Sequence, residues 1–302
     1  MDVRDGVLVV DKPAGPTSFD VVARVKRLLR AGKAGHTGTL DPLATGVLAV
    51  CLGEAVKLQQ YLTDGDKEYE ALVAFGAATT TADAAGEVTQ RGDPAGLDAA
   101  AVRAALARFV GEIEQVPPMF SAVRVAGRRL HEAARAGEEV ERAPRRVRVH
   151  ALELLELAPP VDGLLRARVA VRCGKGTYVR VLATDLGAAL GVPAHLAALR
   201  RTAAGPFTLA DAIPLEEAER LGRSDPQRLS ARLLPAGEAL RGWPAVRLDP
   251  REALELCRGK PLRRPDLPAG LCRALDGEGR LLAVCDGRAG LLQPVRVLRA
   301  IR

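Results

Sequence analysis

Long apolar segments are missing from this sequence of 302 residues. No run approaches the roughly 18 apolar residues that a membrane-spanning helix needs. The first residues, MDVRDGVLVVDKP, contain acids where a secretory signal peptide has its basic start. We therefore expect a cytoplasmic protein without membrane contact. Its hydrophobic share of 48% and charged share of 27% are typical of globular proteins.

Patterns for metals and nucleotide cofactors are missing as well. The five cysteines form no CxxC pair, and the four histidines are not spaced like zinc ligands. Most cysteines lie in apolar stretches such as LAVCLG, so we expect buried, reduced thiols. None of the Gly-Lys pairs is followed by Ser or Thr, and no GxGxxG follows a strand. The sequence therefore contains no phosphate-binding loop motif. The sequence predicts no cofactor and no metal.

Asparagine is absent, and lysine supplies only 7 of the 44 basic residues. The formal net charge is +7 and the pI is about 9.5, which favours an acidic partner, most commonly nucleic acid. A GC-rich coding bias, which replaces lysine by arginine, explains the same composition without any partner. Charge alone therefore leaves nucleic-acid binding open.

Hydrophobic periodicity predicts a chain of mixed helices and strands. Helices are expected at residues 18–30, with Ser18 as the cap, and at 54–62, 97–110, 128–136, 177–190 and 250–258. Strands are expected at residues 6–10, 46–52, 69–75, 147–157, 165–173, 270–275, 280–285 and 293–298. At 165–173 the alternation is clear, because apolar residues take every second place and three of the four residues between them are arginines.

The chain length suggests about two domains. Turn-rich sequence in the stretch 221–244 indicates a boundary, and the segments beyond it indicate a small β-rich domain. Residues 116–149 differ from their surroundings, since they hold eight arginines against four glutamates.

The segment GHTGTLDPLATG, residues 35–46, is the densest candidate site. Its glycines permit close approach of a ligand, and Pro42 keeps Asp41 out of helical conformation. A carboxylate on such a stiff loop is pre-aimed, as a nucleophile or base requires. An ordinary turn, with Asp41 bonding its own backbone, fits the same pattern.

The segment GKGTYVR, residues 174–180, ends a strand and begins a helix. Arg180 would lie near the start of that helix, where its guanidinium can hold a carboxylate in the ionised state. An arginine on a helix surface is the ordinary alternative, and nothing in the sequence pairs Arg180 with Asp41.

Two rings stand out in a chain with only 3% aromatic residues. Tyr69 follows the polar residues DKE, and a tyrosine can stack on a base that has left its helix. His36 can stack or donate a hydrogen bond in the same way. A half-buried strand tyrosine and a loop histidine without a role remain the alternatives.

Taken together and in order, these segments resemble the bacterial TruB family of tRNA pseudouridine synthases, which modify uridine 55 in the T-loop. The resemblance covers residues 1 to about 210 and is weaker beyond. It is carried by LVVDKPAG (8–15), GHTGTLDPLATG (35–46), DKEY (66–69), PPMFSA (117–122), GKGTYVR (174–180) and LRRT (199–202). Several blocks in one order are far more specific than any single block.

The resemblance implies roles for three catalytic residues. Asp41 stands at the place of the family's catalytic aspartate, and Arg180 at that of an arginine that pairs with it. Tyr69 matches a tyrosine that stacks on the target uracil and takes part in proton removal from C5.

Four substrate-binding residues follow from the same resemblance. His36 matches a histidine that fills the space left by flipped nucleotides, and Leu199 matches an apolar residue of the uracil pocket. Tyr178 and Lys12 lie in matching blocks, and a role in supporting the catalytic loop is favoured for Lys12.

The implied fold is α+β, with a mixed, largely antiparallel central sheet, flanking helices and a small C-terminal β-rich PUA-like domain. The implied domains are a catalytic domain at 1–240, with a basic RNA-clasping insertion at about 116–149, and an RNA-binding domain at 245–302. One departure lies in the block Thr79–Asp83, where Thr80 replaces the family's usual acid and Asp83 keeps a carboxylate nearby.

The implied reaction isomerises a tRNA uridine without a cofactor: the bond from C1′ to N1 breaks, the uracil turns, and C5 bonds to C1′. The base must first be flipped out of the T-loop. We expect a monomer that binds the T-stem-loop of tRNA. An RNA-binding or tRNA-folding module without catalysis, or an Asp-dependent nucleosidase, is the alternative; the latter usually needs a second carboxylate.

Overall fold

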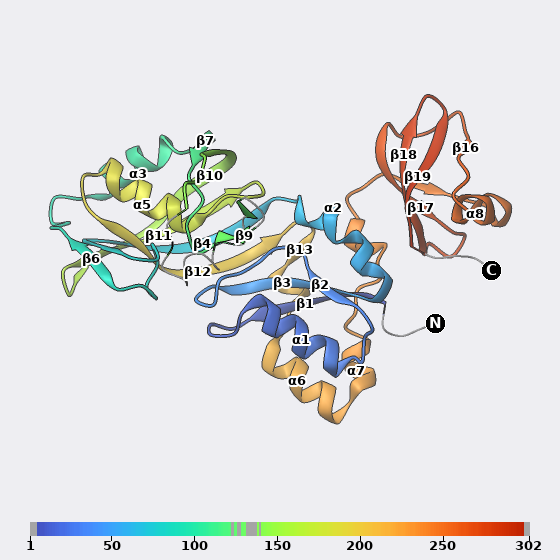
Figure 1. The fold of residues 1–302 in the computed structure, drawn as a ribbon, viewed down its shortest axis with the longest axis horizontal. Helices are drawn as coiled ribbons and strands as arrows, with labels where there is room; N and C mark the ends of the chain where they lie inside the picture. The colour runs from blue at the N-terminus through green and yellow to red at the C-terminus, as the bar shows by residue number, and fades with distance from the viewer. Residues whose placement is uncertain (1–4, 122–123, 126–127, 131–137, 139, 299–302) are drawn as a thin grey trace. The chain divides into compact units, whose positions relative to one another are not determined.

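The computed structural model describes residues 5–121, 124–125, 128–130, 138 and 140–298 (Figure 1). The chain divides into two compact units. Unit 1 contains Met1–Pro42, Gly46–Asp64 and Ala204–Arg302, and unit 2 contains Leu43–Thr45 and Gly65–Ala203. None of the described helices is long and apolar enough to span a membrane.

A sheet of nearly continuous apolar strands forms the centre of unit 1. Strand β1 (Gly6–Lys12) pairs antiparallel with β3 (Thr45–Leu52) and parallel with the short β14 (Ile213–Pro214). The short strand β2 (Ala34–His36) adds to the other edge of β3. Nearly every residue of β1 and β3 is buried, which explains why their sequences read as unbroken apolar runs rather than as alternation.

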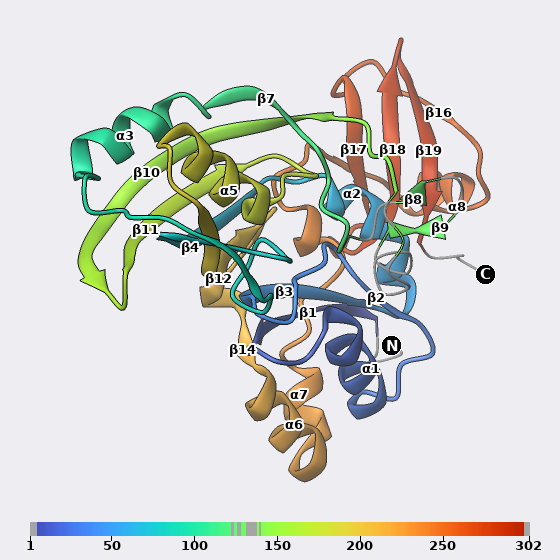
Figure 2. The same ribbon diagram turned by 60° about the vertical axis from the view of Figure 1, so that its left-hand side comes forward.

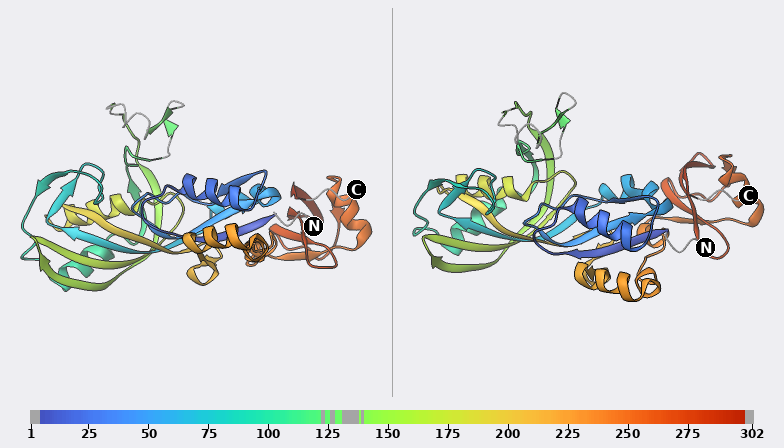
Figure 3. Two further views of the ribbon diagram at one scale, coloured as in Figure 1. Left: turned by 90° about the horizontal axis from the view of Figure 1, so that it is seen from below. Right: turned by 60° about the horizontal axis from the view of Figure 1, so that its bottom comes forward.

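Helices of unit 1 pack beside this sheet. Helix α1 contacts α6, which in turn contacts α7 and β1 (Figures 1 and 3). These helices are α1 (Ser18–Leu28), α6 (Leu215–Ser224) and α7 (Pro226–Ser230). After β3 the chain forms the 3-10 turn η1 (Gly53–Leu58) and the short helix α2 (Gln59–Thr63), where one helix was expected.

The last part of unit 1 is a separate five-stranded sheet in the order β15-β17-β18-β19-β16. Its strands are β15 (Ala245–Arg247), β16 (Leu262–Arg263), β17 (Gly270–Leu275), β18 (Leu281–Arg288) and β19 (Leu291–Val297). Helix α8 (Pro250–Cys257) packs on β18 and β19. Leu275, Leu281 and Val284 share a buried cluster with Val7 and Val9 of β1, so this sheet is fastened to the rest of unit 1.

Unit 2 is built on strands in the order β12-β4-β11-β10-β7, and the pairs from β4 to β7 are antiparallel. The strands are β12 (Ala194–Ala204), β4 (Lys67–Phe75), β11 (Leu164–Cys173), β10 (Arg145–Val161) and β7 (Gly111–Gln115). Helix α3 (Ala99–Ala107) packs on β10, and α5 (Val179–Ala189) packs on β4 and α3 (Figure 2). Two short hairpins complete the unit: β5 (Ala77–Thr79) with β6 (Val88–Arg91), and β8 (Arg124–Val125) with β9 (Arg128–Arg129).

The predicted fold class is confirmed: helices flank a mixed, largely antiparallel sheet, and a small β-rich part ends the chain. One local prediction is wrong, and the start of another differs. Thr17, not Ser18, caps α1, because its side chain accepts the backbone hydrogen bond of Asp20. The helix expected at 128–136 starts later than expected, because Arg128–Arg129 form strand β9 and Leu130 is the first helical residue; residues 131–136 lie outside the described part of the chain.

Candidate active site

Asp41 lies on the loop between β2 and β3, where the residues on both sides of it are fixed. Ser18 Oγ donates to the carbonyl of Leu40 at 2.9 Å and accepts from its amide at 2.8 Å. Ser18 is 2% exposed, so these bonds are shielded from water. On the other side, the amide of Gly15 donates to the carbonyl of Pro42 at 2.9 Å.

Lys12 adds a further bond to this loop. Its side chain is fully buried, and Nζ donates to the carbonyls of Pro13 at 2.9 Å and Pro42 at 3.3 Å. A buried ammonium must be hydrogen-bonded to offset its desolvation. Lys12 therefore supports the backbone that carries Asp41, and a contact of Lys12 with substrate stays a prediction.

His36 ends β2 and leads into the same loop. The amide of Gly38 donates to its Nδ1 at 3.3 Å, so the neutral ring carries its hydrogen on Nε2. The ring of Phe19, from α1, meets the imidazole edge to face, with centroids 6.2 Å apart and planes at 85°. In unit 1, Asp41 thus lies on a loop that His36 precedes and that Lys12 bonds from the end of β1.

Arg180 belongs to unit 2, in the first turn of α5, and is 4% exposed. Its Nε lies 3.7 Å from Oδ2 of Asp83, which is also buried. Its Nη1 donates to the carbonyl of Thr81 at 3.2 Å and its Nη2 to that of Phe120 at 2.9 Å. Asp83 is the carboxylate in the block that departs from the family pattern, and here it forms an ion pair with Arg180. The pairing of Arg180 with Asp41 stays a prediction.

The remaining predicted residues of unit 2 lie directly before α5 and in the strands β4 and β12. Tyr178 is the residue before the helix, and its backbone exchanges two hydrogen bonds with the buried side chain of Gln115, at 2.9 and 3.3 Å. Tyr69 lies half-buried in β4, the strand on which α5 packs. Leu199 of β12 is buried, and its carbonyl accepts from Thr45 at 3.4 Å. Their contacts with a uracil stay predictions.

Sequence reasoning did not identify the residues that hold these groups in place. Ser18, Phe19, Asp83 and Gln115 carry no motif of their own. Only Asp83, after a run of threonines in a block matched to the family, gave a local signal.

Residues 26–179 match the family described as TruB family pseudouridylate synthase (N terminal domain). The chain belongs to the TruB family. Residues 180–241 match the tRNA pseudouridylate synthase B C-terminal domain, and residues 243–299 match the C-terminal domain of tRNA pseudouridine synthase II.

Curated relatives of this TruB chain are similar over nearly their whole length. The tRNA pseudouridine synthase B of Stutzerimonas stutzeri is 46% identical over 98% of this chain and 96% of the relative. That of Cupriavidus metallidurans is 48% identical over 97% of this chain and 94% of the relative. Among solved structures, a chain of a Cbf5–Nop10–Gar1 complex has a TM-score of 0.74 and 27% identity, covering 99% of this chain and 86% of that chain. These likenesses confirm the pseudouridine synthase fold.

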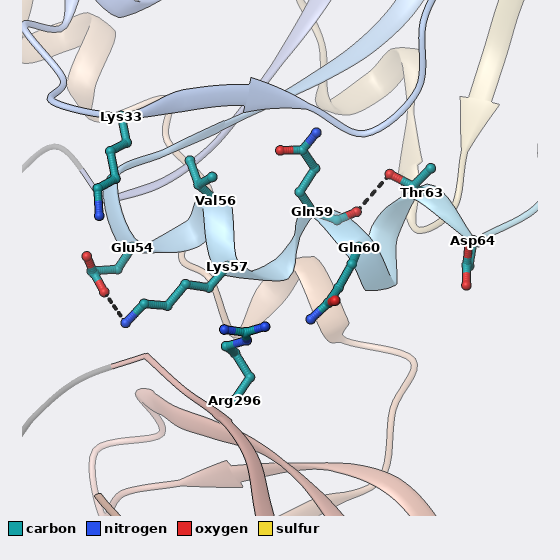
Figure 4. A pocket seen from close by; sticks show the side chains of 10 residues that line it. Lys33, Glu54, Val56, Lys57, Gln59, Gln60, Thr63, Asp64 and Arg296 are labelled. Atoms are coloured by element: carbon teal, nitrogen blue, oxygen red, sulfur yellow. Dashed lines mark hydrogen bonds and ion pairs between the residues drawn. The ribbon is translucent and has the colours of Figure 1, made fainter. Parts of the chain in front are cut away.

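The TruB chain carries a second candidate site in unit 1, a hollow of about 660 Å³ beside η1 and α2. Its polar lining includes the side chains of Lys33, Lys57, Gln59, Gln60 and Arg296, together with Glu54 and Asp64 (Figure 4). Lys57 is held by an ion pair with Glu54 and donates to the carbonyls of Val297 and Leu298, which ties β19 to η1.

Lys33 and Arg296 are exposed and reach into this hollow from opposite sides (Figure 4). Lys33 directly precedes β2, the strand that ends in His36. At about 3.3 Å per residue, Lys33 and His36 lie roughly 10 Å apart along the chain. The hollow therefore adjoins the strand that leads into the Asp41 loop.

The cysteines of this TruB chain are free thiols, and four of the five are buried. Burial raises the pKa of Cys51 to about 12 and that of Cys173 to about 11, because a thiolate loses its hydration there. Such thiols are protonated at neutral pH and are poor nucleophiles and metal ligands. The prediction of buried thiols is confirmed for these four cysteines.

Proposed function

We propose that this TruB enzyme converts uridine 55 in the T-loop of tRNA to pseudouridine, and that Asp41 is its catalytic carboxylate. The observation that carries the proposal is the Asp41 loop, whose backbone is fixed on both sides of the aspartate by buried hydrogen bonds from Ser18 and Lys12. The curated relatives, which are named tRNA pseudouridine synthase B, support tRNA as the substrate.

The reaction conserves the composition of the nucleotide. The C1′–N1 bond breaks, the uracil rotates while it stays in the pocket, and C5 bonds to C1′. The proton on C5 then leaves, and N1 gains one. Asp41 either attacks C1′ or removes the 2′ proton; each route requires it to be ionised, and a guanidinium partner favours that state.

The other predicted residues would each contribute to this chemistry. Arg180 keeps Asp41 anionic, and Tyr69 stacks on the uracil and accepts the C5 proton directly or through water. Leu199 and Tyr178 line the uracil pocket, and exclusion of water protects C1′ from hydrolysis. No step in this scheme requires a cofactor.

Reaching the target requires the enzyme to flip the base out of the T-loop, at a cost of a few kcal/mol. His36 would fill the vacated stack, and phosphate contacts would offset the rest of the cost. The exposed cations Lys33 and Arg296, near the start of the strand that carries His36, are suited to such contacts.

Replacing Asp41 tests the proposal. Asp41→Asn keeps the shape of the side chain and removes its charge, so we expect pseudouridine formation to fall at least a thousandfold. A T-stem-loop RNA with tritium at C5 of uridine 55 measures the reaction, because isomerisation releases that hydrogen. Binding of the same RNA should change less than threefold.

The exposed aspartate of a surface turn provides the control. Asp162→Asn makes the same chemical change in an exposed turn that carries no predicted site residue, so it should leave activity unchanged. Persistent pseudouridine formation by Asp41→Asn would refute the catalytic assignment. Release of free uracil by the unaltered enzyme would instead identify a nucleosidase.

A further inference from the structure

Asp66, which directly precedes β4, carries a carboxylate that faces side chains of two other strands of unit 2. Nε2 of His150, in β10, lies 3.0 Å from its Oδ1, and Nη2 of Arg172, in β11, lies 3.7 Å from its Oδ2. An ionised carboxylate can only accept hydrogen bonds, so Nε2 of His150 carries the hydrogen of this bond. Since β11 lies between β4 and β10 in the sheet, Asp66 connects three neighbouring strands.

A β-bulge directs His150 toward this carboxylate. Val149 pairs with Cys173 and Ala151 pairs with Arg172, so His150 is the extra residue of β10 at this point. The extra residue of a bulge leaves the regular alternation of its strand, and bulges are over-represented next to active sites, where they re-aim a side chain. The irregularity of β10 thus has an identifiable result, which is a hydrogen bond between β10 and the start of β4.

The turn at residues 174–178, which joins β11 to α5, lies beside His150. A Cβ added to Gly174 would lie 3.9 Å from Nε2 of His150. The antiparallel pairing of β4 with β11, continued by one residue, places Asp66 opposite Gly174. Glycine has the greatest backbone freedom, and Gly176 takes a φ of +80°. A turn with two glycines needs contacts from outside to hold one conformation.

Two backbone amides of this turn are hydrogen-bonded to other strands. The amide of Gly174 donates to the carbonyl of Arg148, in β10, at 2.8 Å, and the amide of Tyr178 donates to Oε1 of Gln115, in β7, at 2.9 Å. Arg180 follows Tyr178 by two residues, in the first turn of α5. A displacement of the turn would therefore displace the guanidinium of Arg180.

We propose that His150 is a positioning residue of this enzyme: its hydrogen bond to Asp66 holds β10 and β4 against the turn 174–178 and so fixes where Arg180 and Tyr69 lie. The inference rests on the proposed function, which gives Arg180 and Tyr69 their roles. A displacement of about 1 Å can lower a catalytic rate about 100-fold. A partly exposed pair, with side chains 27% and 44% exposed, adds little to stability. The effect of His150 should therefore appear in kcat rather than in unfolding.

Substitutions of His150 separate its hydrogen bond from its bulk. His150→Leu removes the donor and keeps an apolar side chain, so we expect kcat with T-stem-loop RNA to fall about tenfold, with KM changed less than twofold. His150→Gln should keep kcat within twofold, because its amide nitrogen can donate from about the place of Nε2. Arg168→Leu is the control: it removes an ion pair of 3.0 Å with Glu156, also between β10 and β11, and should leave kcat unchanged.

A double-mutant cycle tests whether His150 acts through Asp66. Asp66→Ala should lower kcat at least as much as His150→Leu, and the two substitutions together should lower it no further than Asp66→Ala alone. Losses that multiply in the double variant would overturn the proposal. An unchanged kcat in His150→Leu, or equal losses in His150→Leu and His150→Gln, would overturn it too.

Hydrogen exchange followed by NMR keeps this outcome separate from that of the proposed function, because it needs no RNA. The amides of Gly174 and Tyr178 should exchange about tenfold faster in His150→Leu than in the unaltered enzyme, and at the unaltered rate in His150→Gln and Arg168→Leu. Faster exchange in His150→Leu, with no pseudouridine formed by the unaltered enzyme, would leave the support of the turn standing and refute the proposed function. Pseudouridine formation with equal exchange in all four proteins would do the reverse.

Discussion

Arg180 and Asp83 show how unit 2 holds a charge in its interior. Both side chains are almost fully buried, with Nε of Arg180 3.7 Å from Oδ2 of Asp83. Asp83 is itself oriented by Thr81 Oγ1 at 2.6 Å and by the amide of Ala85 at 3.0 Å, both on Oδ1. One oxygen is thus used to orient the carboxylate, and the other faces the guanidinium. Removing only the charge of Asp83 would leave Arg180 buried beside a neutral amide.

We predict that Asp83→Asn lowers the free energy of unfolding by roughly 3 kcal/mol, because the buried guanidinium of Arg180 loses the carboxylate that faces its Nε. Urea unfolding followed by circular dichroism measures the change. Asp162→Asn, at an exposed turn, should shift the free energy by less than about 0.5 kcal/mol. Equal, small effects of the two substitutions would show that the Arg180–Asp83 pair does not stabilise the fold.

Helix α1 and the loop before β3 act as one element, because Ser18 bonds the backbone of Leu40 in both directions. Its neighbour Thr17 caps the same helix through hydrogen bonds with Asp20. Substitutions of these two adjacent residues therefore distinguish an effect on helix stability, expected for Thr17, from an effect on loop position, expected for Ser18.

We predict that Ser18→Ala costs about 1–3 kcal/mol of unfolding free energy, because the buried amide and carbonyl of Leu40 lose their partner. It should also lower kcat about 10- to 100-fold, since Asp41 follows Leu40 directly and small displacements of a catalytic group are costly. Thr17→Ala should cost about 1 kcal/mol of stability and leave kcat within twofold. Parallel kinetics and thermal melts of both variants test this; a similar loss of kcat in both would contradict it.

The same elements show what the sequence could predict. The alternation in β11 is local, because burial of every second side chain is written into consecutive residues, and the predicted strand agrees within one residue. Strand β12 was missed, since its sequence AHLAALRRTAA is rich in helix formers. Its place beside β4 in the sheet overrides that propensity.

The candidate site likewise has residues that the sequence predicted and residues that it did not. The motifs pointed to Asp41 and Arg180, because a stiff Asp-Pro loop and a strand–Gly–helix turn are local patterns. The tertiary fold determines the partners of the site residues: Ser18 bonds Leu40, Asp83 pairs with Arg180, and Gln115 bonds Tyr178. No spacing in the sequence encodes contacts between residues that lie so far apart along the chain.

At the scale of the whole molecule, the net charge of +7 supports RNA binding only through particular cations that can contact phosphate. Many arginines are already paired with acids, as Arg24 is with Glu219 and Arg280 with Asp276. Lys33 and Arg296 are different, because they converge on a polar hollow large enough for a nucleotide (Figure 4). Backbone phosphates release counterions when such cations bind them, which makes affinity depend on salt.

We predict that Lys33→Ala combined with Arg296→Ala makes the plot of log affinity against log salt shallower by about 2, or about 1 for each lost phosphate contact. Lys26→Ala with Arg251→Ala removes the same charge from exposed helix positions and should alter the slope by less than 0.5. Titrations with full-length tRNA and with the isolated T-stem-loop locate the contact: a change with both RNAs places it on the T-arm, and a change with full-length tRNA alone places it elsewhere. Equal slopes for the two double variants would mean that RNA does not occupy the hollow, and that the enzyme's affinity for its substrate depends on other cations.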